Sequence, residues 1–394
     1  MTYTISSWVV ALAAFGCALA AQNRPTTGPT ANDSKTVPSE EVLSPAMRKS
    51  RDEAVDRALS WLASRQSSNG AFPTLDIGQP AVTALGLLAF LSCGHVPGEG
   101  PYGDKLAAAV DFIISHQDSE GLIATVSTPG YFHLHTASHT NIYNHAISAI
   151  ALCEVYGMTA AERSRQIRPV IEKAVRFSRG RQLAPKEHSE DKGGWRYLRR
   201  WYYRDADLSV TSWQLVFLRS AKNAGFDIPT EYVDEGLAFV QRLYDPERGC
   251  FVYELSPDGF YPTRGMVGAG ILSLSMAGKH GTEMAQAAGD WVLRNPFDRY
   301  NRLPVDPRTG LESTSRDRYH YGAYYCSQAM FQLGGRYWQR FYPPLVKTLV
   351  ENQGSDGSWE AEAGEDNRYG NVYTTALVVL ALSPPYQFLP VFQR

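Results

Sequence analysis

The stretch that decides the fold is Gln353-Gly354-Ser355-Asp356-Gly357-Ser358-Trp359, which separates two helical patterns. Its Gly, Asp and Ser residues are typical of a tight turn. The same order recurs along the chain: a Gln, a short polar turn with Gly, then an aromatic or apolar residue. The weaker copies begin at Gln66, Gln117, Gln182 and Gln241, and a degenerate copy spans 294–297. Because a repeated pattern indicates a repeated structural unit, we expect an array of similar helix pairs.

Helical spacing of apolar residues surrounds these turns, as at Val233, Leu237 and Val240, whereas the alternation typical of strands is scarce. The pattern predicts six helix pairs. The first helices are expected near 48–64, 103–116, 162–179, 230–243, 282–293 and 336–352, and their partners near 79–93, 140–156, 206–224, 264–279, 319–334 and 370–382. Units of roughly 50–65 residues that cannot bury their own apolar faces must pack on one another, which suits closure into a ring.

The composition indicates an ordered globular protein. Of its 394 residues, 44% are hydrophobic and 12% aromatic, which is enough to bury a sizeable core. The 38 basic and 40 acidic residues are mixed along the chain, giving a formal net charge of -2 without a basic block. Such a distribution argues against nucleic acid as a partner.

The first residues are typical of an export signal. An apolar run over 8–19 is followed by Ala18-Leu19-Ala20, a small-residue cleavage pattern. The run is shorter than the roughly 20 residues that a membrane span requires, which disfavours a retained anchor. We therefore expect a signal peptide over 1–21, cleaved near Ala20, and a secreted or periplasmic protein.

Two further segments are expected after the signal. Residues 22–45 are rich in Pro, Thr, Ser, Asn and Gly and have few large apolar side chains, so they predict a flexible linker. Residues 46–394 are expected to form the folded domain. Its cysteines, Cys93, Cys153, Cys250 and Cys326, lie in hydrophobic surroundings without a paired spacing and are expected to be free buried thiols.

The turn at 353–359 and its copies resemble the repeat of the prenyltransferase and squalene-cyclase superfamily. The resemblance extends from about Glu53 to Leu382 and is greatest to exported members that lack a full Asp-x-Asp-Asp motif. It implies an all-α fold, the α/α toroid, in which the first helix of each pair lies outside and the second lines a central cavity. The starts of the second helices would then meet at one rim of that cavity.

Asp205-Ala206-Asp207-Leu208 matches part of a catalytic motif of that superfamily. Class II terpenoid cyclases protonate an alkene or epoxide with the middle aspartate of Asp-x-Asp-Asp, so the resemblance implies Asp207 as the acid and Asp205 as its electrostatic partner. Leu208 replaces the third aspartate. The residues also support a second interpretation, in which Asp207 caps an apolar helix and the helix dipole lowers the pKa of its carboxyl. Both interpretations stay open from the sequence.

The predicted rim is polar and aromatic, and its tyrosine faces suit the stabilisation of a carbocation. The residues expected to bind ligand there are Tyr143, His145, Thr211, Gln214, Arg264, Arg318, Tyr319, His320, Tyr324 and Tyr373. His133, His135 and His139 form a histidine cluster with His145, but a loop-rich segment makes a metal site the weaker interpretation. The chain has no Asp-x-Cys pair of the kind that zinc-dependent protein prenyltransferases use, so we expect neither a metal nor a cofactor.

Three functions stay open. The first is an exported cyclase-like toroid that binds or isomerises an apolar polyisoprenoid, with contact to a membrane surface compatible with this function. The second is a non-catalytic toroid that binds a ligand or a protein. The third is a secreted carbohydrate-active lyase or hydrolase, although hydrolysis normally requires two separated carboxylates. An apolar wall around Asp207 would favour the first function, and a polar, charged wall would favour a sugar or a protein.

Overall fold

The computed structural model describes residues 42–126, 137–199, 204–256, 262–302 and 317–393. The chain divides into one unit over 1–36 and another over 37–394, and every described residue belongs to the second. The predicted signal peptide, most of the predicted linker, His133 and His135 lie outside the described residues. The predictions made for them therefore stay predictions.

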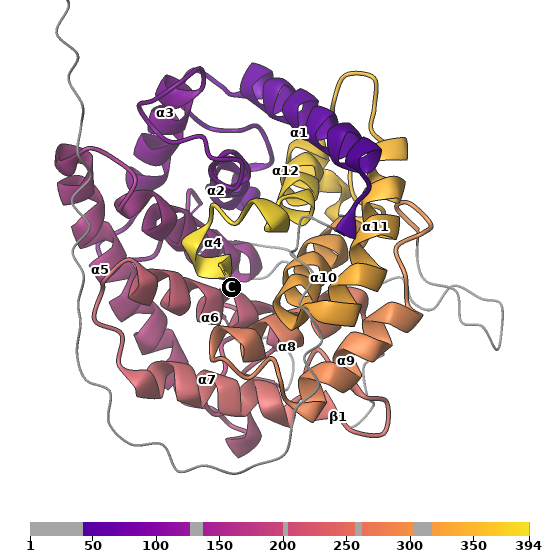
Figure 1. The fold of residues 1–394 in the computed structure, drawn as a ribbon. Coiled ribbons are helices and arrows are strands. Elements are labelled where there is room, and N and C mark those ends of the chain that lie inside the picture. Colours follow the sequence, from indigo (N-terminus) through magenta and orange to yellow (C-terminus); the bar gives the residue numbers. More distant parts are fainter. Residues whose placement is uncertain (1–41, 127–136, 200–203, 257–261, 303–316, 394) are drawn as a thin grey trace, which may run out of the picture. The chain divides into compact units, whose positions relative to one another are not determined.

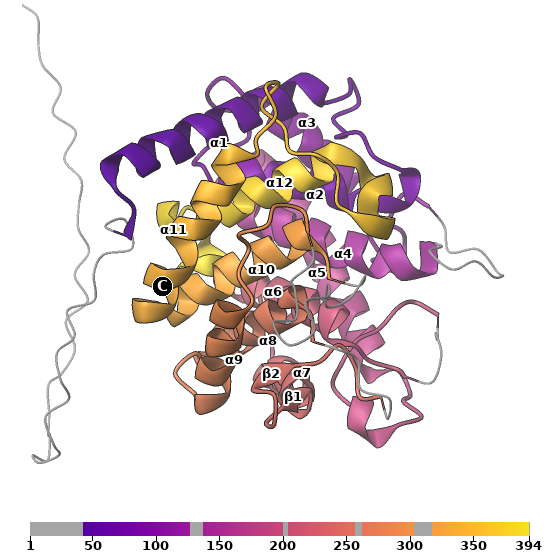
Figure 2. The ribbon, with the colours of Figure 1, turned by 90° about the vertical axis from the view of Figure 1, so that its right-hand side faces the viewer.

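The second unit is an α/α toroid, as the sequence predicted (Figure 1). The inner helices are α2 (Ala81–Leu91), α4 (Ala137–Tyr156), α6 (Leu208–Asn223), α8 (Arg264–Met276), α10 (Tyr319–Leu333) and α12 (Gly370–Leu382). The outer helices are α1 (Pro45–Arg65), α3 (Gly103–Ile114), α5 (Ala161–Leu183), α7 (Thr230–Arg242), α9 (Glu283–Arg294) and α11 (Gly335–Glu351). Each inner helix contacts the next, and α12 contacts α2, which closes the ring (Figures 1 and 2).

Short elements connect the helices. The strands are β1 (Tyr244–Asp245) and β2 (Cys250–Phe251), which form an antiparallel hairpin. The short 3-10 helices are η2 (Asp76–Gly78), η3 (Ser189–Asp191), η4 (Gly364–Tyr369), η5 (Pro384–Tyr386) and η6 (Pro390–Phe392).

The difference between the two layers follows from sequence. Every residue of α2 is buried, because an inner helix packs against neighbours on all sides. In α7, by contrast, the buried residues are confined to one stripe around Leu237 and Val240. Burial of these apolar faces is the main force holding the two layers together.

The repeated glutamines join neighbouring outer helices. Gln353 Nε2 donates to the Gly357 carbonyl of its own turn and to the Ala54 carbonyl of α1, each at 2.8 Å. The equivalent pairs of acceptors are Gly70 and Lys105 for Gln66, Gly121 and Val170 for Gln117, and Gly193 and Tyr232 for Gln182. Each glutamine thus satisfies carbonyls of two consecutive repeats, which explains why the pattern recurs.

The aromatic residue that ends the turn connects it to both layers. The backbone N–H of Trp195 donates to Thr211 Oγ1 of inner helix α6 at 3.0 Å, and its indole Nε1 donates to the Ser178 carbonyl of outer helix α5 at 2.8 Å. The same two bonds recur at the last turn, from Trp359 to Thr375 and Leu349. The turns are therefore structural junctions.

The C-terminal segment lies across the end of the ring where the inner helices finish (Figure 1). Asn223, the last residue of α6, donates to the Pro390 carbonyl at 3.1 Å, and Gln332 of α10 donates to the Phe392 carbonyl at 2.7 Å. Near the end of α4, the buried Glu154 accepts the Val391 N–H at 3.4 Å. Three inner helices thus hold this segment in place.

Two further expectations concern the described residues. Cys93, Cys153, Cys250 and Cys326 are all free, and the last three are buried, which confirms the prediction of free thiols. None of the described helices combines the length and the apolar character that a membrane span requires.

Replacing Gly193 by Ala is expected to lower the free energy of unfolding by about 1–3 kcal/mol. Gly193 has a φ of 89°, and an added Cβ would lie 2.1 Å from the Glu235 carbonyl oxygen of α7. Gly180 provides the matched control, because it lies inside α5 with no atom near an added Cβ, and Gly180→Ala should be neutral or stabilising. Urea unfolding of both variants tests this, and equal midpoints would contradict it.

Candidate functional site

Asp207 caps the N-terminus of α6. Its backbone is extended, with a φ of -142°, and its Oδ1 accepts the Val210 N–H at 2.8 Å. The carboxylate has no exposed surface. The capping function that the sequence suggested for Asp207 is therefore confirmed.

A buried arginine connects Asp207 to a second carboxylate. Arg196 Nη1 lies 3.6 Å from Asp207 Oδ2 and 2.6 Å from Glu254 Oε2. All three side chains are buried. The two carboxylates thus share one guanidinium nitrogen, and the resulting cluster carries a net charge of minus one when all three groups are ionised.

Burial raises the pKa of Asp207 to about 6, although Arg196, the Val210 N–H and the Tyr253 hydroxyl each lower it. The nearby Glu254 carboxylate raises it further. Burial therefore outweighs the helix N-terminus, contrary to the lowered pKa that the cap alone predicted. Near neutral pH the carboxyl of Asp207 can exist in either protonation state.

Asp205 belongs to a different network. Its Oδ2 accepts the Glu187 N–H at 2.8 Å, and its backbone N–H donates to Asp191 Oδ2 at 2.7 Å. The carboxylate that acts on Asp207 through Arg196 is Glu254, which follows β2 and was not predicted. The role of Asp205 as the electrostatic partner of Asp207 stays a prediction.

A chain of hydroxyl groups crosses three inner helices next to Asp207. Tyr143 of α4 donates to Ser209 Oγ of α6 at 3.0 Å, and Ser209 Oγ lies 2.8 Å from the Tyr321 hydroxyl of α10. Trp213 Nε1 donates to the same Tyr321 hydroxyl at 3.2 Å. Tyr143 and Tyr321 are half-buried, so both retain exposed surface. The structure thus brings the predicted Tyr143 close to Tyr321 through Ser209.

Aromatic side chains of α10 pack around Trp213 of α6. Tyr324 stacks on Trp213 with centroids 5.4 Å apart and an interplanar angle of 8°. Tyr325 meets Trp213 edge-on at 5.3 Å and Tyr321 at 4.9 Å. The predicted Tyr324 therefore belongs to a packed aromatic cluster on α6 and α10.

Three predicted ligand-binding residues instead contact the outer layer or its turns. Thr211 accepts the Trp195 N–H, Gln214 accepts the Ser178 hydroxyl of α5 at 2.6 Å, and His145 packs on Phe177 of α5 at 4.8 Å. All three are fully buried. Burial lowers the pKa of His145 to about 3, so this imidazole is neutral. Their observed contacts hold the two layers together.

Arg264 and Tyr319 fix the segment that follows α9. Arg264 pairs with Asp317 at 2.7 Å and donates to the carbonyls of Pro296 and Arg302 at 2.9 and 3.0 Å. The Tyr319 hydroxyl donates to the Phe297 carbonyl at 2.8 Å. Both predicted residues are buried, and their contacts are internal to the protein.

The start of α10 is held by a glutamate that the sequence did not single out. Glu362 accepts the backbone N–H groups of Tyr319 and His320 at 2.8 and 2.9 Å, and lies 3.3 Å from His320 Nδ1. The predicted Arg318 donates to Asp366 at 3.0 Å. Tyr373, half-buried on α12, contacts Tyr369 at 5.7 Å. These contacts connect the starts of α10 and α12 with η4 and with Glu362, which precedes η4.

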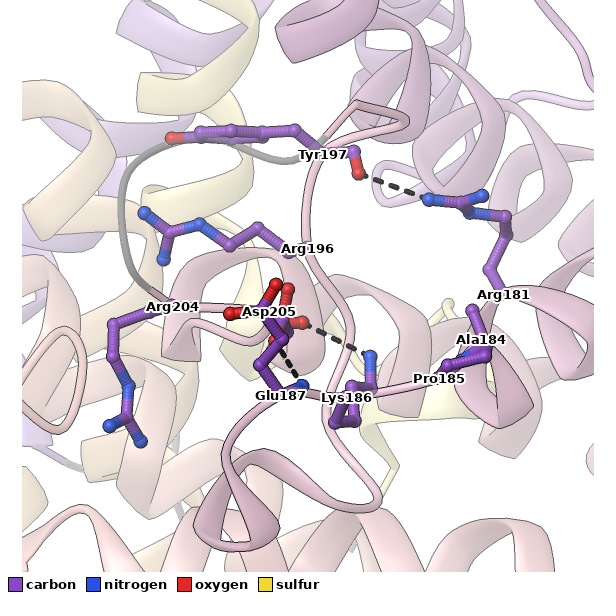
Figure 3. Close-up of a pocket in the computed structure, with 9 residues that line it drawn as sticks. All are labelled: Arg181, Ala184, Pro185, Lys186, Glu187, Arg196, Tyr197, Arg204 and Asp205. Atoms are coloured by element: carbon purple, nitrogen blue, oxygen red, sulfur yellow. Dashed lines mark hydrogen bonds between the residues drawn. The ribbon is translucent and has the colours of Figure 1, made fainter.

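A cavity of about 310 Å³ adjoins the Asp207 network (Figure 3). Its lining is Arg181, Ala184, Pro185, Lys186, Glu187, Arg196, Tyr197, Arg204 and Asp205. Arg196 belongs both to this cavity and to the pair with Asp207, and the Tyr197 hydroxyl lies 2.7 Å from that of Tyr253. The cavity next to Arg196 is therefore lined mainly by polar and charged side chains.

Among the described residues, no three His, Cys, Asp or Glu side chains gather where they could hold one metal ion. His133 and His135 lie outside the described residues, so the metal question for this segment stays open. His139 packs against the Tyr197 ring at 4.2 Å.

Asp207 is expected to make stability depend on pH. Since its pKa rises from 3.8 to about 6 on folding, the folded protein binds more protons between these values, and its stability falls as the pH rises through this interval. Asp207→Asn retains an oxygen for the cap but does not titrate. The free energy of unfolding of wild type minus that of Asp207→Asn should therefore decrease from pH 4 to pH 7. A difference that stays constant with pH in urea unfolding would contradict this. Asp207→Ala also loses the cap, so its free energy of unfolding should be about 1 kcal/mol lower than that of Asp207→Asn at every pH.

Comparison with known proteins places the fold. No family model and no curated protein matches the chain. Among solved structures, the type II terpene cyclase MstE from Scytonema is similar, with a TM-score of 0.53 at 13% identity over 86% of this chain and 100% of that one. An alpha-1,6-mannanase of a Salegentibacter species in complex with alpha-1,6-mannotetrose has a TM-score of 0.57 at 12% identity, over 86% of this chain and 99% of that one. A glycosidase in complex with glucose has a TM-score of 0.57 at 11% identity, over 88% of this chain and 100% of that one. The chain thus has the α/α toroid fold that terpene cyclases and glycosidases share.

Proposed function

We propose that this toroid binds a carbohydrate at the end of the ring where the inner helices begin. The observation that carries the proposal is the hydroxyl chain Tyr143–Ser209–Tyr321, which brings three inner helices together and leaves both tyrosines partly exposed. Sugars are bound by such convergent hydroxyl groups and by the faces of aromatic rings. The export signal predicted over 1–21 would bring the protein close to polysaccharides.

The charges near Asp207 favour binding over hydrolysis. A glycosidase places two carboxyl groups on either side of the scissile bond. Asp207 and Glu254 instead meet on one nitrogen of Arg196, and both are buried. In this arrangement Asp207 positions Arg196, whose side chain lines the adjoining cavity.

The structural neighbours are compatible with this function. The mannanase and the glycosidase were solved with alpha-1,6-mannotetrose and glucose, so a toroid of this kind accommodates sugars in those proteins. The terpene cyclase has a comparable structural similarity, and the fold alone does not separate the two classes. The polar side chains around Asp207 favour the sugar.

Tyr143→Phe and Tyr321→Phe should each weaken binding of the oligosaccharide selected by a glycan array. Removing one hydroxyl that bonds the ligand costs roughly two- to tenfold in affinity, measured by calorimetry on the full chain. Tyr102→Phe is the matched control, since its hydroxyl contacts Ser60 in the outer layer. Unchanged affinity in both test variants, or no glycan bound at all, would refute the proposal.

A second candidate is acid-initiated cyclisation of a polyisoprenoid. It is favoured by the raised pKa of Asp207, about 6, and by the aromatic cluster around Trp213, whose faces suit a carbocation. Incubation with squalene should then yield a cyclised product by mass spectrometry, which Asp207→Asn abolishes and Asp205→Asn retains. Absence of product from wild type, beside an active cyclase control, would exclude this candidate for that substrate.

A further inference from the structure

The cavity beside α6 has an unusual distribution of charge. Four of its nine lining side chains are basic, and two are acidic. Arg204 pairs with Asp191 at 2.6 Å, and Arg196 pairs with Glu254 and Asp207. In Figure 3 these two arginines extend away from Arg181. Their charges are therefore matched by carboxylates outside the cavity.

Arg181 and Lys186 are held differently. Arg181 Nη2 donates to the carbonyls of Tyr197 and Leu198 at 3.2 and 3.0 Å, and Lys186 Nζ donates to the Asp205 carbonyl at 3.0 Å (Figure 3). Within the described part of the chain, these neutral oxygens are their hydrogen-bond acceptors, and the buried Arg181 Nε has none. Two cations thus face one cavity without a carboxylate bonded to either.

The two acidic residues of the lining have contacts of their own. The Asp205 carboxylate accepts the Glu187 N–H, and both residues make further interactions. Desolvation lowers the pKa of Arg181 and of Lys186, while the Asp205 charge offsets part of the effect on Lys186. A partly buried cation without a bonded counter-charge is costly, and an anion placed between these two side chains would remove that cost.

We propose that Arg181 and Lys186 form a subsite for an oxyanion, and that the carbohydrate bound at the adjoining ring end carries a carboxylate or a sulfate ester. The second half of this proposal rests on the proposed function, whereas the subsite itself does not. Arg196 and Tyr197 connect the two places, because both line the cavity and both belong to the network around Asp207. In Figure 3 the backbone carbonyl of Tyr197 faces Arg181, while its ring extends to the opposite side.

The experiment compares glucuronate with glucose, and inorganic sulfate with inorganic phosphate, by calorimetry on the full chain at low ionic strength. Glucuronate should bind at least about tenfold more tightly than glucose, since a charge-assisted hydrogen bond is about twice as strong as a neutral one. The preference should shrink in high salt. Arg181→Gln and Lys186→Gln should each lower the affinity for glucuronate toward the affinity for glucose. Lys192→Gln, an exposed lysine in the same loop, should leave it unchanged.

The possible outcomes separate the two proposals. If sulfate or phosphate binds through Arg181 and Lys186 while no sugar binds, the subsite stands and the carbohydrate proposal fails. If glucose and glucuronate bind equally, or if both glutamine variants retain the preference, the subsite is refuted and carbohydrate binding survives. Because Arg181 also donates hydrogen bonds to two backbone carbonyls, thermal unfolding is measured for each variant. Should Arg181→Gln prove unfolded, the binding result of Lys186→Gln decides the test.

Discussion

Consecutive repeats of the ring are joined by one recurring hydrogen-bond arrangement, that of the glutamine side chain near the end of an outer helix. Gln353, which follows α11, donates from one amide nitrogen to two backbone carbonyls at once. One acceptor belongs to its own turn and the other to α1, nearly 300 residues earlier in the chain, so this bond joins the last repeat to the first. The conformation of Gly357, with a φ of 93°, lets the turn approach the Arg57 backbone closely enough for the bond to form.

The charged cluster at the start of α6 shows how the same scaffold holds a site. Asp207 satisfies the helix N-terminus with one oxygen and faces Arg196 with the other. Arg196 in turn holds Glu254, so three elements that are distant in sequence are fixed around one guanidinium. Burying such charges is costly unless each is paired, and here each carboxylate lies within ion-pair distance of Arg196.

The sequence predicted the helices well because their signals are local. The expected ranges 206–224 and 319–334 differ from α6 and α10 by only a few residues, since apolar spacing and turn residues mark both ends. The site was harder to predict. Arg196, Glu254 and Glu362 lie in connecting segments, and nothing in their local sequence indicates which helix start they meet.

The direction of side chains on the inner helices was the second difficulty. Because inner helices are buried on all sides, periodicity does not distinguish the face toward the ring interior from the face toward the outer layer. His145, Thr211 and Gln214 were expected to bind ligand, yet they contact outer helices or turns. The neighbouring Ser209 and Trp213, on another face of α6, meet Tyr321 instead.

The C-terminal segment lies across the last turns of α4, α6 and α10, so the two ends of the ring differ. That end of the ring is covered by the protein's own chain, and the covering residues are 60 or more positions away in sequence from the helix residues that they bond. Loss of this short segment would therefore remove contacts from three inner helices at once.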